Sequence, residues 1–506
     1  MISGWSLLVL SLLIGFFGGT LIIGYITGKR TEEAEKEAKS TEEKLHQFYV
    51  AGGTLSVIPV LFSFMATYME AYEFVGMPAV IISDGLEWWL CEMIYYLSFV
   101  GLFYFVGTRI YRVGKKFKYI TPTDLIAHRV GGFERGIRVL LGIMITYATI
   151  MYIGSIYIPA AGVLSAATEG EIGYKTFLAL YVIFIIIYVS AGGMRAVAWA
   201  DVMAGITYII AFAAMIFAVF HYWGGFSELA WKAYTSDIGS HVFQKTLPYR
   251  YFLTMLTLYG VSWLFIPHLV VRFFAAKDYK TMLTSGVGSN AGFFLGAFLS
   301  PFLLGLSLAA FYGSNLPNVE VVEGYVPSFF MDLFGKGPLV ALILLGLIAI
   351  TRSTIDSMLL LASSIVDVDI FEKGLHIKVS EKYRRLLTTL IVIFVAVASV
   401  AVALNPEAAM VRITYEIVWP AYAIIAWPTL AMLFWKRANK YGGLAGYLAG
   451  FISLILFTYV IWPEWPHNPF GVWEGALPSL ISVIAVVVVS LLTPAPPKEF
   501  VEEYYG

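Results

Sequence analysis

The 506-residue sequence has a single cysteine and few charged residues. Cys91 has no second cysteine to pair with, which excludes an internal disulfide framework, and no Cys/His grouping has the spacing of a zinc site. Charged residues make up 13% of the chain, whereas about a quarter is typical of soluble proteins. No G-x-x-x-x-G-K-[ST] segment occurs, so a nucleotide-driven pump is not indicated. The low charge, with 59% hydrophobic residues, predicts a protein that crosses a membrane many times.

Hydrophobic segments long enough to span about 30 Å of hydrocarbon recur along the whole chain. We predict an all-α polytopic membrane protein with 13 transmembrane helices and no soluble domain. The predicted spans are Trp5–Ile26, Leu55–Ile82, Trp88–Val106, Val139–Leu164, Tyr174–Ser190, Ala196–Trp223, Tyr251–Phe274, Gly286–Tyr312, Leu339–Ile365, Leu386–Leu404, Val411–Trp435, Gly443–Trp462 and Leu477–Leu492.

The basic residues are concentrated in alternate loops between these spans. If the N-terminus lies outside, most of the 33 Lys and Arg residues fall on the cytoplasmic side, in agreement with the positive-inside rule. An odd number of spans then places the C-terminus in the cytoplasm. The first span has no preceding positive charge and no cleavage-like site after it, so we read it as a retained helix rather than a signal peptide. The expected location is the plasma membrane.

The span Leu339–Ile365 carries a dense polar cluster in its second half. Its members are Thr351, Arg352, Ser353, Thr354, Asp356 and Ser357. Polar groups in hydrocarbon are costly unless they face an ion, a cavity or one another, so this cluster is a candidate functional site. Two structural explanations stay open: hydroxyls can serve helix packing, and Arg352 and Asp356 can neutralise each other at i,i+4 spacing.

Two spans contain signals for a broken helix. The second has Glu70 and Glu73 at mid-membrane followed by Gly76 and Pro78, and the seventh contains the run Gly260–His268 with Pro267. The two spans are five apart, an odd offset that reverses the direction of the second half. Secondary transporters place their sites at such breaks in inverted repeats, although the same signals also occur in simple bends.

Six motifs in order resemble those of the sodium/solute symporters, the family of sodium/glucose, sodium/proline and sodium/pantothenate carriers. They are YVAGGTLS at Tyr49–Ser56, GMPA at Gly76–Ala79, ITPTDLIAHR at Ile120–Arg129, SAGGMRAVAWADV at Ser190–Val202, PHLVVRFFAAKD at Pro267–Asp278 and STIDSMLLLASSIVDVDIF at Ser353–Phe371. The resemblance implies a leucine-transporter-type core of two inverted five-helix repeats, with one helix before it and two after it. It also implies sodium as the coupling ion.

The resemblance also implies two cation sites. The first would use the carbonyls of Ala66, Met69 and Ile350 and the hydroxyls of Ser353 and Thr354. This suits sodium, a hard cation that prefers oxygen ligands. A possible second site would use Asp201, Ser353, Asp356 and Ser357. Asp356 departs from the family's hydroxyl there, so either an extra carboxylate strengthens cation binding or Arg352 takes the place of the ion.

The solute is expected between the broken helices. Tyr259 and Trp263 match substrate-facing aromatics of the proline carriers, and Tyr68, Glu70, Tyr72 and Glu73 surround the other break. Paired carboxylates disfavour an anion, and Glu73 replaces a neutral residue that sugar carriers use. We therefore favour sodium-coupled symport of an amino acid or related amine by alternating access. The alternative is sodium- or proton-coupled monocarboxylate uptake, and protons could act through Glu70 or Glu73.

Other classes fit the sequence less well. A channel would need repeated polar rings, usually from several subunits. An enzyme would need clustered reactive groups, and the best single candidate, His268, lies in a kinked family-like stretch where a structural role is expected. We predict a solute, sodium and the lipid bilayer as partners, no nucleic acid, and a monomer sufficient for function.

The predicted segments follow from these assignments: a leading helix (1–28), a cytoplasmic linker (29–48), a first repeat (49–223), a second repeat with extracellular loops (224–435), two accessory helices (436–493) and a cytoplasmic tail (494–506).

Overall fold

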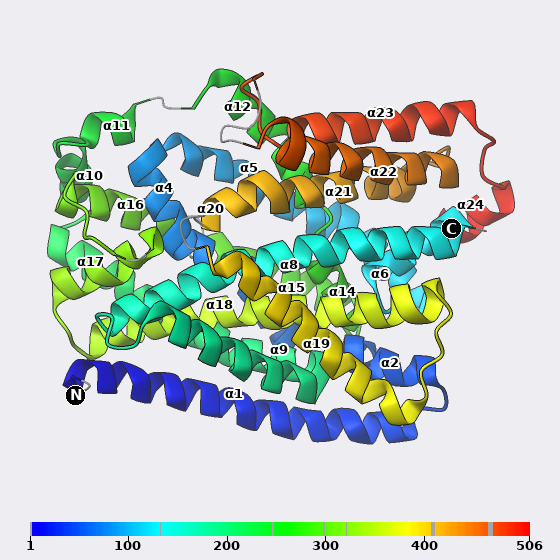
Figure 1. The fold of residues 1–506 in the computed structure, drawn as a ribbon, viewed down its shortest axis with the longest axis horizontal. Coiled ribbons are helices and arrows are strands. Elements are labelled where there is room, and N and C mark those ends of the chain that lie inside the picture. Colours follow the sequence, from blue (N-terminus) through cyan, green and yellow to red (C-terminus); the bar gives the residue numbers. More distant parts are fainter. Residues whose placement is uncertain are drawn as a thin grey trace.

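A computed structural model describes residues 3–131, 133–244, 247–294, 296, 299–319, 321–405, 410–463 and 469–505. These residues form a bundle of helices that run mostly along one direction, with the two termini at opposite ends of that direction (Figure 1). We call the two ends of the bundle the α2 end and the α17 end, after helices that lie there (Figure 1). Opposite termini are what an odd number of spans requires.

The first half of the chain begins with a long outer helix and contains the first broken helix. Its elements are α1 (Gly4–Glu37), α2 (Thr41–Val50), η1 (Ala51–Gly53), α3 (Val57–Tyr68), η2 (Tyr72–Gly76), α4 (Met77–Asp84), α5 (Glu87–Gly101), η3 (Leu102–Gly107), α6 (Thr108–Phe117), α7 (Pro122–Val130), α8 (Glu134–Ala167), α9 (Tyr174–Trp223), α10 (Phe226–Tyr234) and α11 (Gly239–Phe243).

The second half contains the second broken helix and the two C-terminal accessory helices. Its elements are α12 (Tyr249–Thr254), η4 (Met255–Tyr259), α13 (Gly260–Ser262), α14 (Pro267–Ala275), α15 (Tyr279–Phe293), α16 (Leu299–Tyr312), η6 (Val322–Gly324), α17 (Tyr325–Phe334), α18 (Pro338–Ser364), η7 (Ile365–Gly374), α19 (Glu381–Ala403), α20 (Met410–Ile413), η8 (Thr414–Val418), α21 (Trp419–Phe434), α22 (Lys440–Leu456), η9 (Phe457–Ile461), α23 (Ala476–Leu492) and α24 (Lys498–Tyr505).

Among the described residues, eight helices are long and apolar enough to cross a membrane, and four apolar helices are shorter. Each of the thirteen predicted spans is mostly helical, and residues 295, 297 and 298 of Gly286–Tyr312 lie outside the described part. The count of thirteen crossings therefore stays a prediction. The linker expected from residue 29 is largely helical, because α1 continues to Glu37 and α2 begins at Thr41.

The two predicted breaks are present. α3 ends at Tyr68, and the chain is non-helical at Met69 and Glu70 before a π-helical turn begins at Tyr72. The second break separates α13 from α14, with Phe265 and Ile266 non-helical. Pro267 then starts α14, because a proline at a first helical position needs no hydrogen-bond acceptor for its nitrogen.

The start of α3 and the end of α14 are joined side by side. The Leu55 N–H donates to the Ala275 carbonyl at 3.0 Å, and the Lys277 N–H donates to the Leu55 carbonyl at 3.0 Å. The motifs Tyr49–Ser56 and Pro267–Asp278 are therefore in direct contact although they are far apart in sequence.

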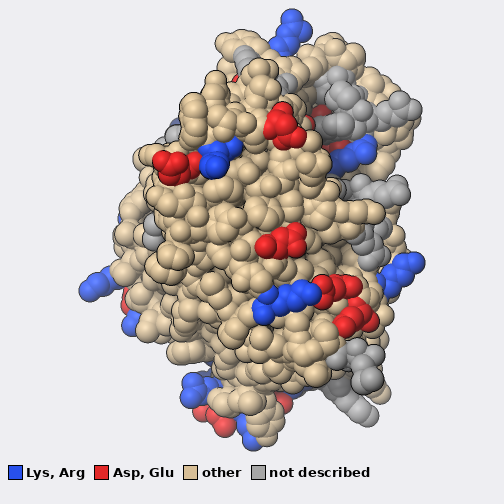
Figure 2. Space-filling view, turned by 90° about the vertical axis from the view of Figure 1, so that its left-hand side faces the viewer, with Lys and Arg blue, Asp and Glu red and all other residues tan. Residues whose placement is uncertain are grey.

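α18 lies in the middle of the bundle and packs against α3, α8, α9, α14 and α19. Large apolar side chains point outward from the surrounding helices, for example Ile14 and Phe217, each 71% exposed. On the α17 end, Figure 2 shows scattered charged side chains, several of them beside a charge of opposite sign, on a mostly uncharged surface. The molecule thus exposes large apolar side chains around its sides and buries a polar cluster within a largely apolar core.

Candidate functional site

The polar cluster of α18 meets the broken helix α3 in the interior. Ser353 and Thr354 are both fully buried. The Ser353 Oγ lies 2.6 Å from the Ala66 carbonyl oxygen and 2.8 Å from the Ile350 carbonyl oxygen. The Thr354 Oγ1 lies 3.5 Å from the Ala66 carbonyl oxygen. Four of the five residues predicted for the first sodium site therefore converge on one point.

This convergence leaves a surplus of oxygen lone pairs. A serine hydroxyl carries one proton and can donate to only one carbonyl at a time. Met69 adds to the oxygen-rich character, because its extended conformation (φ −89°, ψ 124°) turns its carbonyl away from the axis of α3. Neutral oxygens from a helix break and from neighbouring hydroxyls are suitable ligands for a monovalent hard cation.

Two of the four residues predicted for the second cation site, Asp201 and Asp356, lie beside an arginine, whereas Ser353 faces the Ala66 carbonyl. The Arg352 guanidinium pairs with Asp356 on its own helix, and its Nη2 lies 3.6 Å from the Asp201 Oδ1. All three side chains are fully buried. A positive charge of the protein itself thus lies between the two carboxylates that the sequence suggested for an ion.

A second arginine completes this charged cluster and connects three elements. Arg272 of α14 lies 3.7 Å from the Asp201 Oδ2, donates from Nε to the Ser63 Oγ of α3 at 2.9 Å, and hydrogen-bonds the Ser357 hydroxyl of α18. Asp201 also accepts from the Ser63 Oγ at 2.7 Å. Two arginines and two aspartates make the cluster electrically neutral, which is the arrangement that buried charges require.

The carboxylates at the first break have a different environment. Glu70 is 1% exposed and accepts a hydrogen bond from the Tyr152 hydroxyl of α8. The Glu70 N–H donates to the Glu73 Oε2 at 2.8 Å. The other oxygen of Glu70, Oε2, is buried and has no hydrogen-bond partner.

Aromatic rings from several elements surround this position. The Tyr152 ring centroid lies 5.5 Å from that of Trp419 and 6.1 Å from those of His268 and Tyr422. The Trp419 ring in turn lies 4.0 Å from the Trp263 ring and 5.9 Å from the Tyr259 ring. The predicted residues Tyr259 and Trp263 therefore belong to one aromatic cluster with Glu70.

The remaining predicted solute residues separate into two groups. Tyr72 joins Glu92 and Tyr415: its hydroxyl lies 2.7 Å from the Tyr415 hydroxyl and 3.2 Å from the Glu92 Oε1. Tyr68 instead packs among phenylalanines, with its ring centroid 3.9 Å from Phe99 and 5.7 Å from Phe293. Tyr68 thus packs in an apolar cluster and not on the Glu70 side of the break.

Sequence reasoning missed several residues of this region, namely Tyr152, Trp419, Tyr422, Glu92, Tyr415 and Arg272. Glu92 carried a usable signal, because it is an ionisable residue inside the predicted span Trp88–Val106. The buried tyrosines and tryptophans carried none, since aromatic residues are common in membrane helices for packing alone.

At the α2 end, an ion-pair network joins α7, α8 and η7. Arg138 binds Asp124 at 2.8 Å and Asp369 at 2.5 Å, and the Lys373 Nζ lies 3.1 Å from Asp124. Burial alone would raise the pKa of Asp124, but the Lys373 ammonium, the Arg138 guanidinium and two backbone N–H groups hold it below its usual range.

This network predicts a pH-dependent effect of Asp124→Asn. Because the folded pKa is depressed, the ionised Asp124 stabilises the fold above its unfolded pKa of about 3.9, and this contribution is lost as the pH falls through the folded value. We expect the variant to melt below the parent protein at every pH from 5 to 9 and the gap to narrow only under strongly acidic conditions. Thermal melting in detergent measures this, with the exposed Glu228→Gln as control. A variant that melts at or above the temperature of the parent protein between pH 5 and 9 would contradict it.

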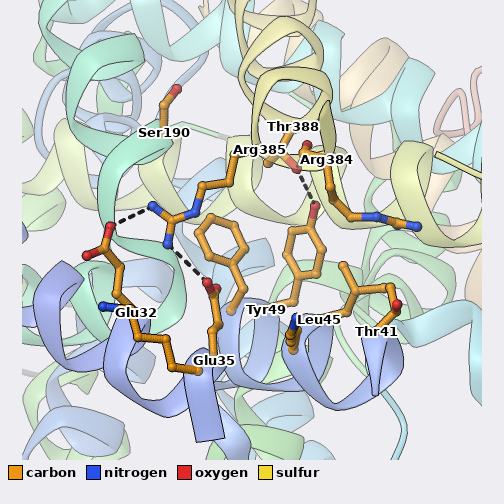
Figure 3. A pocket seen from close by; sticks show the side chains of 12 residues that line it. Glu32, Glu35, Thr41, Leu45, Tyr49, Ser190, Arg384, Arg385 and Thr388 are labelled. Atoms are coloured by element: carbon orange, nitrogen blue, oxygen red, sulfur yellow. Dashed lines mark hydrogen bonds and ion pairs between the residues drawn. The ribbon is translucent and has the colours of Figure 1, made fainter. Parts of the chain in front are cut away.

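A pocket of about 370 Å³ opens at the same end between α1, α2, α9 and α19. Figure 3 shows Arg385 of α19 reaching Glu32 and Glu35 of α1, at 2.8 and 3.0 Å, and Tyr49 of α2 facing Thr388. The Tyr49 hydroxyl also donates to Asp367 at 3.1 Å. None of the predicted sodium or solute residues lines this pocket; its contacts tie the outer helix α1 to the core.

Two broken helices that meet a buried polar centre are typical of secondary transporters. The sequence model of the Sodium:solute symporter family matches residues 48–450. The chain belongs to this family.

Individual relatives agree with this membership. The high-affinity proline transporter PutP of Bacillus subtilis is 26% identical over 96% of this chain and 98% of its own length. The sodium/pantothenate symporter of Haemophilus influenzae is 24% identical, covering 89% of this chain and 90% of its own. A sodium/proline symporter of Staphylococcus aureus is 26% identical, covering 90% and 89%.

Solved structures share the fold. A Na⁺-coupled sialic acid symporter in a substrate-bound outward-open state aligns with a TM-score of 0.75 at 18% identity, covering 97% of this chain and 99% of its own. A nucleobase-cation-symport-1 family transporter aligns with a TM-score of 0.53 at 13% identity, covering 90% and 98%.

Proposed function

We propose that the protein is a sodium-coupled symporter of a small organic solute and that sodium binds where α18 meets the break in α3. The observation that carries the proposal is the placement of the Ser353 Oγ between the carbonyls of Ala66 and Ile350. Thr354 and the carbonyl of Met69 would supply further oxygens. The sodium ion needs no carboxylate there, because five or six neutral oxygens can replace its hydration shell.

The break itself supplies a mechanism for coupling. Met69 and Glu70 are consecutive, so an ion that fixes the Ala66 and Met69 carbonyls also fixes the backbone that presents Glu70 to the solute. Sodium would therefore favour the conformation that binds solute, and by linkage the solute would tighten sodium by the same factor. Arg272, which connects α14 to α3 and α18, would transmit the change to the second broken helix.

For the second cation position we propose that Arg352 takes the place of an ion. Its guanidinium already lies between Asp201 and Asp356, and with Arg272 it balances both carboxylates. A sodium ion added to this neutral cluster would have to displace an arginine, at a large electrostatic cost. The proposal is therefore one sodium ion per transport cycle.

The proposed solute is an amino acid or related amine. Glu70 and Glu73 at the break favour a positively charged group over a monocarboxylate, and the family relatives include carriers named for proline, which bears a positively charged nitrogen. We also propose a plasma-membrane location with the N-terminus outside and the C-terminus cytoplasmic, since this orientation places most basic residues in the cytoplasm.

Uptake by proteoliposomes tests the proposed function. With equal pH on both sides and a protonophore present, we expect an inward sodium gradient to drive labelled amino acids or amines inward at least about tenfold faster than an equal potassium gradient. The sodium gradient drives the solute inward because the binding of the two is coupled. Uptake that is equally fast in potassium, or that disappears with the protonophore, would contradict sodium coupling.

A further inference from the structure

The buried ionisable groups of the interior fall into two clusters with different charge balance. Around Asp201 and Asp356, two arginines match two carboxylates. Around the first break, the groups are the carboxylates Glu70, Glu73 and Glu92. In the described part of the chain, neither Glu70 nor Glu92 forms an ion pair with a basic side chain, while both are less than 7% exposed. A positive charge from outside the protein would therefore balance the charge of Glu70 and Glu92.

Glu70 has one carboxylate oxygen that a ligand could bind. Its Oε1 is occupied by the Tyr152 hydroxyl, whereas its Oε2 is buried without a hydrogen-bond partner. A buried acceptor of this kind is costly in hydrocarbon and is normally satisfied in the functioning molecule. Other groups that face this region are the His268 ring beside Tyr152 and, beyond it, Arg272, whose Nη1 donates to the His268 carbonyl at 2.5 Å. Arg272 is already engaged by Asp201, Ser63 and Ser357.

The rings around Glu70 suit an organic cation. Trp263 and Trp419 lie with ring centroids 4.0 Å apart, and Tyr152 and Tyr259 flank Trp419 at 5.5 and 5.9 Å. Aromatic faces attract ammonium groups through their quadrupoles, most strongly where water is excluded. A carboxylate beside several aromatic rings is the combination that binds amines and quaternary ammonium ions.

The aromatic wall continues from Glu70 to Glu92. The Tyr259 ring, 5.9 Å from Trp419, stacks on the Tyr415 ring at 5.4 Å, and the Tyr415 hydroxyl hydrogen-bonds Glu92. The Tyr72 hydroxyl reaches the same carboxylate at 3.2 Å. A cation would therefore meet acidic and aromatic groups along the whole wall. For the carboxylate of a zwitterion, the described part of the chain places no basic side chain in an ion pair with either glutamate.

We infer that the transported solute is an organic cation, an amine or quaternary ammonium compound without a free carboxylate, whose charged nitrogen binds Glu70 inside the ring cluster of Tyr152, Trp263, Trp419 and Tyr259. The inference rests on the proposed sodium-coupled function and narrows its solute class. Glu92 guides the cation toward Glu70 and does not replace it.

Thermal melting of the purified full-length protein in sodium and in potassium tests this inference. The probes are choline, ethanolamine and putrescine as cations, proline and glycine betaine as zwitterions, and acetate as an anion. We expect at least one cation to raise the melting temperature saturably in sodium and the zwitterions and acetate to leave it unchanged, because a ligand stabilises only the state that binds it.

Glu70→Gln tests the role of the charge. The amide keeps an acceptor for Tyr152, so the fold should survive, and the shift produced by sodium alone should remain. We expect the cation affinity to fall on the order of tenfold to a hundredfold, whereas the exposed Glu228→Gln should bind normally.

The outcomes separate the inference from the function on which it rests. Stabilisation by proline or acetate with none by any cation, or an unchanged cation affinity in Glu70→Gln, would overturn the organic-cation inference. In that case, sodium-driven uptake of proline or acetate would still support the proposed symport function. Absence of sodium-driven uptake for the whole panel would instead overturn the symport function.

Discussion

Replacing Ser353 by alanine is expected to raise the sodium concentration for half-maximal uptake by about 10- to 100-fold. The Ser353 Oγ is the atom that lies between the Ala66 and Ile350 carbonyls, and a hydrogen-bonding group lost from a charged ligand costs about 1.5–3 kcal/mol. Thr354→Ala should act in the same direction but less, because its Oγ1 is 3.5 Å from the Ala66 carbonyl. The measurement is the initial uptake rate as a function of sodium at fixed ionic strength.

Ser363→Ala is the matched control. Ser363 lies on the same helix and is buried, but its Oγ donates to the Leu360 carbonyl of α18 at 2.9 Å and lies almost three turns from Ser353. We expect its sodium dependence to match that of the parent protein. If Ser353→Ala and Ser363→Ala had equal sodium requirements, the sodium site would have to be placed elsewhere.

The second large effect is expected at Arg352. Arg352→Met leaves Asp356 without its pairing cation and Asp201 with Arg272 alone. Removing one partner of a buried ion pair destabilises a protein by about 3–5 kcal/mol, so we expect a strongly lowered melting temperature or loss of folded protein. Arg385→Met is the control, because the exposed Arg385 pairs with Glu32 and Glu35 at the surface and such pairs contribute about 0–1 kcal/mol.

A double variant distinguishes the electrostatic role of Arg352 from simple packing. Arg352→Met with Asp356→Ser removes one charge of each sign and restores a hydroxyl where the family resemblance expects one. We expect it to fold better than Arg352→Met. If Arg352 stands in place of an ion, the cleared site should admit a second sodium, and the sodium activation curve should become sigmoidal with a Hill coefficient rising from about 1 toward 2. A hyperbolic curve in this well-folded variant would refute the substitution of an ion by Arg352.

The breaks and the polar cluster could be predicted from local sequence. Pro267 stands directly after the second break, Gly76 and Pro78 mark the span that contains the first although its break falls earlier, at Met69 and Glu70, and the run from Thr351 to Ser357 stands out against its apolar neighbours. The pairing of Arg352 with Asp356 follows from the period of a helix, which brings residues four apart onto one face. The position of Asp201 beside the same arginine does not, because no local rule connects two helices.

The contacts of the residues proposed for the solute also could not be predicted from local sequence. Tyr68 and Glu70 are two residues apart, yet Tyr68 packs with Phe99 and Phe293 while Glu70 bonds to Tyr152. The non-helical residues at Met69 and Glu70 change the direction of successive side chains, so helical spacing cannot assign their faces. Which aromatic side chains approach Glu70 depends on how α8, α13 and α21 pack.

The sequence by itself determined the membrane class, the family, the helices and the two places where a helix is interrupted, because hydropathy and backbone preferences act over short distances. The tertiary structure alone decided that Ser353 meets Ala66 across 287 residues, that Arg352 is shared by Asp201 and Asp356, and that Tyr152 bonds Glu70 and Glu92 bonds Tyr72. These contacts depend on the relative placement of helices. That placement is set by the packing of the whole bundle and not by any one segment.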